Sequence, residues 1–179
     1  MIPLPMKFST AMKLAVVLSI VVSAGGLAFA EFYEPRELDE EAAEQAVVEG
    51  INEERADRGM QPLSTSSELS ELASYHSDRM VDLDFYGHTA PDGESVGDRL
   101  PCRHGSENLN KIPFRQQFDD PSGESFMSMD GADVGNDTTQ MWMNSASHEE
   151  NILDDSFSNI GVGVSVDDDG EIHITAKFC

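Results

Sequence analysis

The chain has 179 residues, of which 34 are acidic and 11 are lysine or arginine, so its net charge at pH 7 is −23. This charge argues against nucleic-acid binding and against binding to anionic membranes, because both depend on clustered basic residues. The length predicts one domain with a hydrophobic core. The acidic residues are spread along periodic apolar segments, which favours a folded halophilic protein adapted to high salt over a disordered chain.

Residues 1–30 have the features of a secretory signal peptide. Lys7 and Lys13 come first, an apolar run occupies 14–30, and the run ends in an A-x-A pattern at 28–30. This ending is typical of a cleavage site. The alternative is an uncleaved anchor on the outer face of the membrane, because the run has about the minimum length for a bilayer span. We therefore expect a secreted, extracellular protein with a linker at 31–38 and a domain at 39–179.

Two amphipathic helices are expected at the start of the domain. Asp39 is placed to cap the first helix, and Gly59 is placed to end it. Its apolar residues recur every four positions: Ala43, Val47 and Ile51. Thr65 and Glu68 form the capping-box pattern that begins the second helix. The apolar face expected for the second helix is Leu69, Leu72, Ala73, His76, Met80 and Leu83. His76 is interpreted as a buried, hydrogen-bonded residue outside any site.

Residues 110–133 are the segment that the sequence explains least. The segment is longer than an ordinary connection, and three interpretations stay open: a binding lid, an irregular extra hairpin or a flexible insert. A helix with an apolar face is expected next, and it ends near Trp142. The residues of that face are Val134, Thr138, Met141 and Trp142. His148 is expected in a turn just beyond this helix.

The C-terminal region is predicted to form a β-hairpin, with strands at 160–166 and 172–178 and a turn at 167–170. Gly161 and Gly163 in the first strand indicate either a bulge or a close approach of another backbone. The chain has two cysteines, Cys102 and Cys179. In an exported chain such a pair predicts one disulfide.

Four segments, in the same order along the chain, resemble motifs of the CAP superfamily, also called the SCP domain, and most closely its short secreted prokaryotic members. They are N-x-x-R-x-x-x-G at 52–59, F-x-x-H-T-x-P-D-G at 85–93, S-E-N-L at 106–109 in place of G-E-N-I, and W-M-N-S-x-x-H-x-x-N-I-L followed by I-G-V-G at 142–163. The resemblance covers residues 45–178. It implies an α+β fold, a three-layer α-β-α sandwich with a small, mainly antiparallel sheet.

The resemblance also implies a cleft lined by two histidines and usually two glutamates. His88, Glu107 and His148 fall on three of these positions, and Ser145 stands on the fourth. Two neutral imidazoles that face one cleft can hold a divalent metal such as zinc, with Glu107 as third ligand or as the group that orients a histidine. The alternative is a hydrogen-bonded cluster that only holds the loops together.

By this resemblance the function expected first is non-enzymatic. Relatives bind lipids, sterols or other proteins, so we expect a secreted monomer that binds a small hydrophobic ligand, a divalent metal or an extracellular protein partner. One alternative is a protease-like hydrolase with Ser145, His148 and Glu107 as a triad. The chain lacks the G-x-S-x-G elbow of many serine hydrolases. Another alternative is a structural cell-surface module whose cleft is vestigial.

Overall fold

The computed structural model describes residues 38–113 and 130–179. In chain order their elements are α1 (Glu40–Asp57), β1 (Ser64–Thr65), α2 (Ser67–Asp82), α3 (Val96–Arg99), β2 (Ser106–Pro113), α4 (Gly131–Met143), α5 (Ala146–Ile152), β3 (Asn159–Val166) and β4 (Glu171–Phe178). The expected signal peptide or anchor at 1–30 and most of the expected linker lie outside the described residues. Within the described ranges, no helix is both long enough and apolar enough to cross a membrane.

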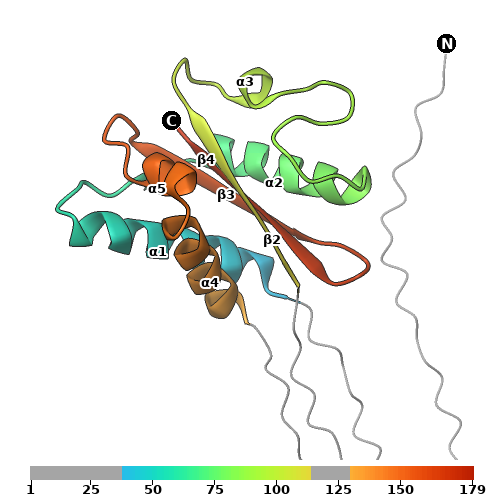
Figure 1. The fold of residues 1–179 in the computed structure, drawn as a ribbon, viewed down its shortest axis with the longest axis horizontal. Coiled ribbons are helices and arrows are strands. Elements are labelled where there is room, and N and C mark those ends of the chain that lie inside the picture. The colour runs from blue at the N-terminus through green and yellow to red at the C-terminus, as the bar shows by residue number, and fades with distance from the viewer. Residues whose placement is uncertain (1–37, 114–129) are drawn as a thin grey trace, which may run out of the picture. The chain divides into compact units, whose positions relative to one another are not determined.

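The four strands form one sheet in the order β1-β3-β4-β2. The short β1 runs parallel to β3, and the other pairs are antiparallel. Helix α2 covers one face of the sheet, while α1, α4 and α5 lie together on the other (Figure 1). This arrangement confirms the expected α+β fold with a mainly antiparallel sheet between helices.

The main hydrophobic core lies between the sheet and the layer of α1, α4 and α5. Side chains on a strand alternate between the two faces of a sheet, and in β3 and β4 every second residue enters this core. The strand residues of the core are Ile160, Val162, Val164, Ile172, Ile174, Ala176 and Phe178. They pack against Ala43, Val47 and Ile51 of α1, which confirms the predicted face of the first helix.

The opposite face of β3 is made of backbone, because Gly161 and Gly163 lie directly under α2. A Cβ atom at Gly161 would overlap the backbone of Leu69 and Ser70, and one at Gly163 would overlap the backbone of Ser74. The strand glycines therefore mark a close approach of α2, one of the two readings that the sequence allowed. Glycine also brings α4 close to α1, where Gly135 lies against Ala46.

Several local predictions for the helices were wrong by small shifts. Ser66, not Thr65, caps α2, because Thr65 is paired with Ile160 in β1. Leu83 is 47% exposed. Helix α2 ends at Asp82, so Leu83 does not continue the buried face of the helix. Met141 is 49% exposed, since it is adjacent to Trp142 and points to a different side of α4. His148 lies within the separate helix α5 and not in a turn.

The expected irregular segment at 110–133 is shorter than predicted. Residues 110–113 continue β2 and residues 131–133 begin α4, so regular structure enters the segment from both sides. Residues 114–129 lie outside the described residues, and the three interpretations of that stretch stay predictions. The expected disulfide is present between Cys102 and Cys179, where it ties the end of β4 to the loop before β2.

Candidate functional site

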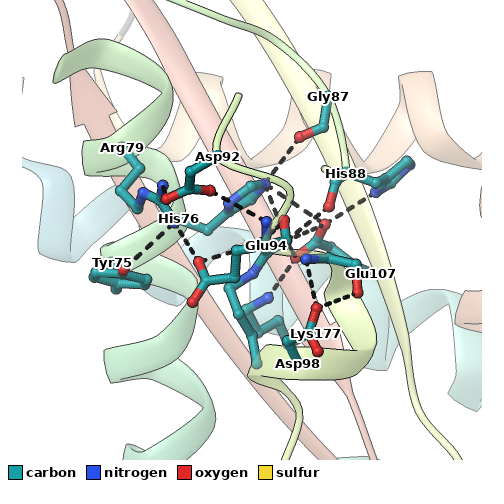
Figure 2. A network of polar contacts seen from close by, with 12 residues as sticks. Tyr75, His76, Arg79, Gly87, His88, Asp92, Glu94, Asp98, Glu107 and Lys177 are labelled. Atoms are coloured by element: carbon teal, nitrogen blue, oxygen red, sulfur yellow. Dashed lines mark hydrogen bonds and ion pairs between the residues drawn. The ribbon is translucent and has the colours of Figure 1, made fainter. Parts of the chain in front are cut away.

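Glu107 lies at the centre of a buried network of charged and polar side chains (Figure 2). Its side chain is fully buried and contacts four others. Oε1 is 2.9 Å from Nδ1 of His88 and 3.6 Å from Nε2 of His76. Oε2 pairs with the Lys177 ammonium and lies 3.3 Å from Nη2 of Arg99. A buried carboxylate is stable only with such pairing, because burial strips both of its oxygens of water.

Four elements of the fold bring these side chains together. Glu107 on β2 and Lys177 on β4 are paired in the antiparallel register, so both side chains point to the face under α2. Arg99 is the last residue of α3, and His76 is on the buried side of α2. Residues from separate stretches of the sequence thus meet between the sheet and α2.

The network fixes the charge state of its members. Burial raises the pKa of the Glu107 carboxyl, but the hydrogen bond with His88 and the charge of Lys177 outweigh this and lower the pKa to about 2. Burial lowers the pKa of His76 to about 4, although the charge of Glu107 opposes the shift. At neutral pH Glu107 is therefore a carboxylate, and His76 is a neutral imidazole.

The same network holds the loop that carries His88. His76 Nε2 lies 3.1 Å from the carbonyl oxygen of Gly87, and Arg99 donates to the carbonyl oxygen of His88 at 2.9 Å. Further along the loop, Arg79 of α2 pairs with Asp92 and Glu94 (Figure 2). Two backbone carbonyls beside the histidine are thus fixed by side chains from α2 and α3.

His88 combines a fixed ring with an accessible face. Its Nδ1 is tied to Glu107, while the side chain is 51% exposed. Within the described part of the chain, Nε2 makes no hydrogen bond. A carboxylate on Nδ1 sets the tautomer and orientation of an imidazole and leaves Nε2 for a metal or a proton. Since both Glu107 oxygens already have cationic or imidazole partners, Glu107 fits the orienting role better than that of a direct ligand.

His148 approaches the same region from α5, on the other side of β2. Burial lowers its pKa, and the charge of His88 lowers it further. The ring lies 6.5 Å from the Trp142 ring, between centroids, and the side-chain amide of Asn108 donates to the His148 carbonyl oxygen. Trp142 is itself a core residue, with Nε1 donating to the carbonyl oxygen of Leu109 at 2.9 Å. The two predicted histidines thus flank β2, and their role stays a prediction.

Ser145, the fourth candidate, begins α5. Its hydroxyl oxygen is 3.4 Å from that of Ser147, and in the described residues it makes no hydrogen bond to the His148 ring. Glu107 orients His88 and not His148. In a hydrolytic triad the serine contacts a histidine and the same histidine contacts a carboxylate. The described residues do not make this pair of contacts.

Sequence reasoning missed the basic and imidazole side chains that surround Glu107. His76, Arg99 and Lys177 were not assigned to the site, although each of them contacts Glu107. Two signals were available: a histidine on an otherwise apolar helix face, and a lysine in a strand whose neighbours are apolar or small. In an acidic chain with so few basic residues, a buried lysine indicates a carboxylate partner.

One described pocket lies away from these histidines, between α1, the start of α2 and β3. Its volume is about 390 Å³. It is lined mainly by polar and acidic side chains: Glu41, Glu44, Gln45, Val48, Glu49, Thr65, Ser70 and Val162. Most of these side chains end in a polar group, although the larger part of the surface that lines the pocket is apolar.

Known proteins resemble this chain in sequence or in fold. The uncharacterized protein YkwD of Bacillus subtilis (strain 168) is 30% identical over 127 residues, a match that takes in 68% of this chain and 42% of YkwD. An extracellular protein containing an SCP domain from Bacillus anthracis superposes with a TM-score of 0.57 and 22% identity over 78% of this chain and 40% of its own. This chain thus spans less than half the length of either protein.

Two further solved structures share the fold at lower identity. An outer surface protein from Borrelia burgdorferi has a TM-score of 0.59 and 17% identity over 76% of this chain and 90% of its own. NaASP2, solved with Zn²⁺, has a TM-score of 0.55 and 14% identity over 77% of this chain and 79% of its own.

The family comparison covers most of the domain. The model of the cysteine-rich secretory protein family, CAP, matches residues 48–178, a range that begins in α1 and ends with β4. The matched range contains all four site candidates together with the buried network. The chain therefore belongs to the cysteine-rich secretory protein (CAP) family.

Proposed function

We propose that this CAP-domain protein acts outside the cell as a non-enzymatic binding module, and that His88 and His148 bind a divalent cation such as zinc. The observation that carries the proposal is the contact of 2.9 Å between His88 Nδ1 and the buried Glu107 carboxylate. This contact leaves Nε2 of a half-exposed ring available. Similar proteins with this fold are described as an extracellular protein and an outer surface protein, which supports secretion.

The donor set fits a zinc ion that is held weakly. Neutral imidazole is a preferred zinc ligand, and the buried carboxylate behind His88 would raise the basicity of that ligand. The lowered pKa of His148 keeps the second imidazole neutral over a wider pH range. With two histidines and open remaining positions, the ion would supply a charged centre to which a small ligand or an extracellular protein binds. The support for zinc from known proteins is the NaASP2 structure solved with Zn²⁺.

Calorimetric titration with Zn²⁺ at pH 7.5 tests the proposal. We expect His88→Ala and His148→Ala each to remove one equivalent of bound zinc. His104→Ala is the matched control, because His104 is an exposed histidine paired with Asp154 and lies outside the network. Binding at the cleft should weaken at pH 5.5, because protons compete with the metal for the imidazole nitrogens.

Two results would contradict the proposal. One is zinc binding that is equal in the parent and in the His88→Ala/His148→Ala double variant. The other is a loss of zinc in the single variants that occurs only because they unfold, which far-ultraviolet circular dichroism would show. In that case the histidines are structural, and the cleft holds loops together.

A further inference from the structure

A second group of metal-ligand side chains lies at the far end of the β3–β4 hairpin. Asp167, Glu171 and His173 each offer one ligand atom, and these atoms all lie within 4.8 Å of one another. Asp167 follows β3, while Glu171 and His173 are alternate residues of β4 and therefore share a face of the sheet. None of the three belongs to the network around Glu107.

The two carboxylate oxygens of Asp167 have different partners. One accepts hydrogen bonds from the backbone of the turn, and the other faces His173. Oδ1 accepts the backbone N–H groups of Asp169 at 3.0 Å and of Glu171 at 2.8 Å. Oδ2 is 3.2 Å from Nε2 of His173. Burial raises the pKa of the Asp167 carboxyl, but these backbone hydrogen bonds and His173 outweigh it and lower the pKa. The backbone hydrogen bonds of the turn therefore hold this carboxylate in one orientation.

His173 distinguishes this group from the exposed acidic clusters that are common on an acidic protein. The residue is only 2% exposed, and its Nε2 is aimed at the Asp167 carboxylate. Its Nδ1 is buried and has no hydrogen-bond partner among the described residues. A buried imidazole whose nitrogen lies 3.2 Å from one carboxylate, with a second carboxylate oxygen within 4.8 Å, offers donor types that transition metals bind.

The carboxylates of this group already attract one cation, the ammonium of Lys111. It is the register partner of His173 on β2, and its ammonium pairs with Glu171. The hydrogen bond with Glu171, and then the charges of Asp167 and Asp84, raise the pKa of Lys111. Because the lysine side chain is 32% exposed, its ammonium can move into solvent when another cation takes its place.

We propose that Asp167, Glu171 and His173 form a second divalent-metal site, independent of the histidine cleft. One imidazole nitrogen and two carboxylates suit zinc, manganese or cobalt, and water would complete the coordination. Asp167 lies at the start of the hairpin turn and the other two ligands lie on β4, so a bound ion would cross-link the turn to the strand that follows it. Lys111 competes with the metal for Glu171.

The test uses the His88→Ala/His148→Ala double variant, so that the cleft contributes nothing. This protein is titrated with Zn²⁺ by calorimetry and with Co²⁺ by visible absorption. We expect one equivalent to bind in each case. Glu171→Gln should weaken binding by about tenfold or more, since it removes a charged ligand. Asp168→Asn is the matched control: it removes the same charge from the same turn at an exposed position, and it should leave the affinity unchanged.

Lys111→Gln gives the opposite expected result. Removal of the competing ammonium should tighten metal binding by about tenfold at low salt, and less at high salt, because the interaction is between partly exposed charges. His173→Gln should abolish the visible Co²⁺ bands. If that variant fails to fold, Glu171→Gln and Lys111→Gln still decide the question.

Three outcomes would overturn the proposal. The double variant binds no Zn²⁺; Glu171→Gln and Asp168→Asn weaken binding equally, which would indicate a diffuse effect of charge; or Ca²⁺ binds as tightly as Zn²⁺ and His173→Gln does not change the affinity. Each of these results is distinct from failure of the histidine cleft, because the cleft histidines are absent from the protein used.

Discussion

The two faces of the central sheet are both buried, yet they are built from different chemistry. On the side of α1 and α4, the strands present isoleucine, valine and other apolar residues that form the main core. On the side of α2, β3 and β4 present glycine, serine, threonine, histidine, lysine and glutamate, and β2 presents Glu107 and Lys111 with the apolar Leu109 between them. Phe178 and Lys177 are neighbours in sequence, both are 0% exposed, and they lie on opposite faces.

This difference shows that burial does not require an apolar side chain if every charge finds a partner. Under α2 the glycines allow a close approach of backbones, and hydrogen bonds add to the packing of the buried Leu69, Ala73 and Met80. Ser77 of α2 donates to the carbonyl oxygen of Gly163 and also contacts the hydroxyl of Thr175, both at 2.9 Å. Next to them, Glu107 and Lys177 form the buried ion pair. The polar face carries Glu107 and its buried partners, whereas the apolar face holds the main hydrophobic core.

Glu107→Gln should produce the largest loss of stability. The variant removes one buried charge and leaves Lys177 and Arg99 without their partner, so we expect the free energy of unfolding to fall by about 3–5 kcal/mol. The folded pKa of about 2 is below the reference value of 4.5, so this contribution is complete above pH 4.5 and is lost as pH falls towards 2. Denaturant unfolding at pH 7, 4.5 and 3 measures it. If the variant and the parent have the same free energy of unfolding at pH 7, the network does not stabilise the fold as described.

Ile174→Ala should cost about 2–5 kcal/mol, because it opens a cavity in a fully buried position of the apolar face. Its neighbour on the other face provides the matched comparison. Thr175→Val keeps the volume and removes one hydrogen bond to Ser77, so we expect a loss of about 1 kcal/mol. Urea unfolding of both variants compares packing with hydrogen bonding at adjacent residues. Equal losses would show that the two faces do not differ as proposed.

Gly163→Ala should destabilise the fold by about 1–3 kcal/mol, because the new methyl group would overlap the backbone of α2 at Ser74 and force the helix away. Val162→Ala removes side-chain volume from the opposite face at the adjacent residue and serves as the reference. Thermal melting of the two variants gives the comparison. If Gly163→Ala melts at the parent temperature, the close approach of α2 to β3 does not limit packing there.

The smallest expected effect concerns pH. His76 is neutral in the folded protein because burial lowers its pKa to about 4, below the reference value of 6.5. The unfolded chain therefore takes up a proton first as pH falls, and the stability from this residue is lost between pH 6.5 and 4. Between pH 6.5 and 5.5 we expect a loss of about 1 kcal/mol. His76→Gln should reduce this pH dependence, while His104→Gln at an exposed position should not. An unchanged profile in His76→Gln would be the contrary result.

Much of the framework could be predicted from the sequence, because it depends on local patterns. The spacing of Ala43, Val47 and Ile51 marked the buried face of α1, and the alternation of Ile172, Ile174 and Ala176 marked that of β4. Gly161 and Gly163 indicated either a bulge or a close approach within a strand. All four candidate side chains lie in sequence motifs that are local in the chain.

The environment of those side chains was decided only by the tertiary structure. No local pattern shows that Lys177 lies opposite Glu107, since 70 residues separate them and the register of β2 with β4 creates the pair. His76 looked like a residue of an apolar helix face, but the surface that it meets is the polar face of the sheet. Sequence periodicity shows which side chains turn inward, whereas the partners they find there, and so their charge and pKa, depend on strands that meet only in the folded protein.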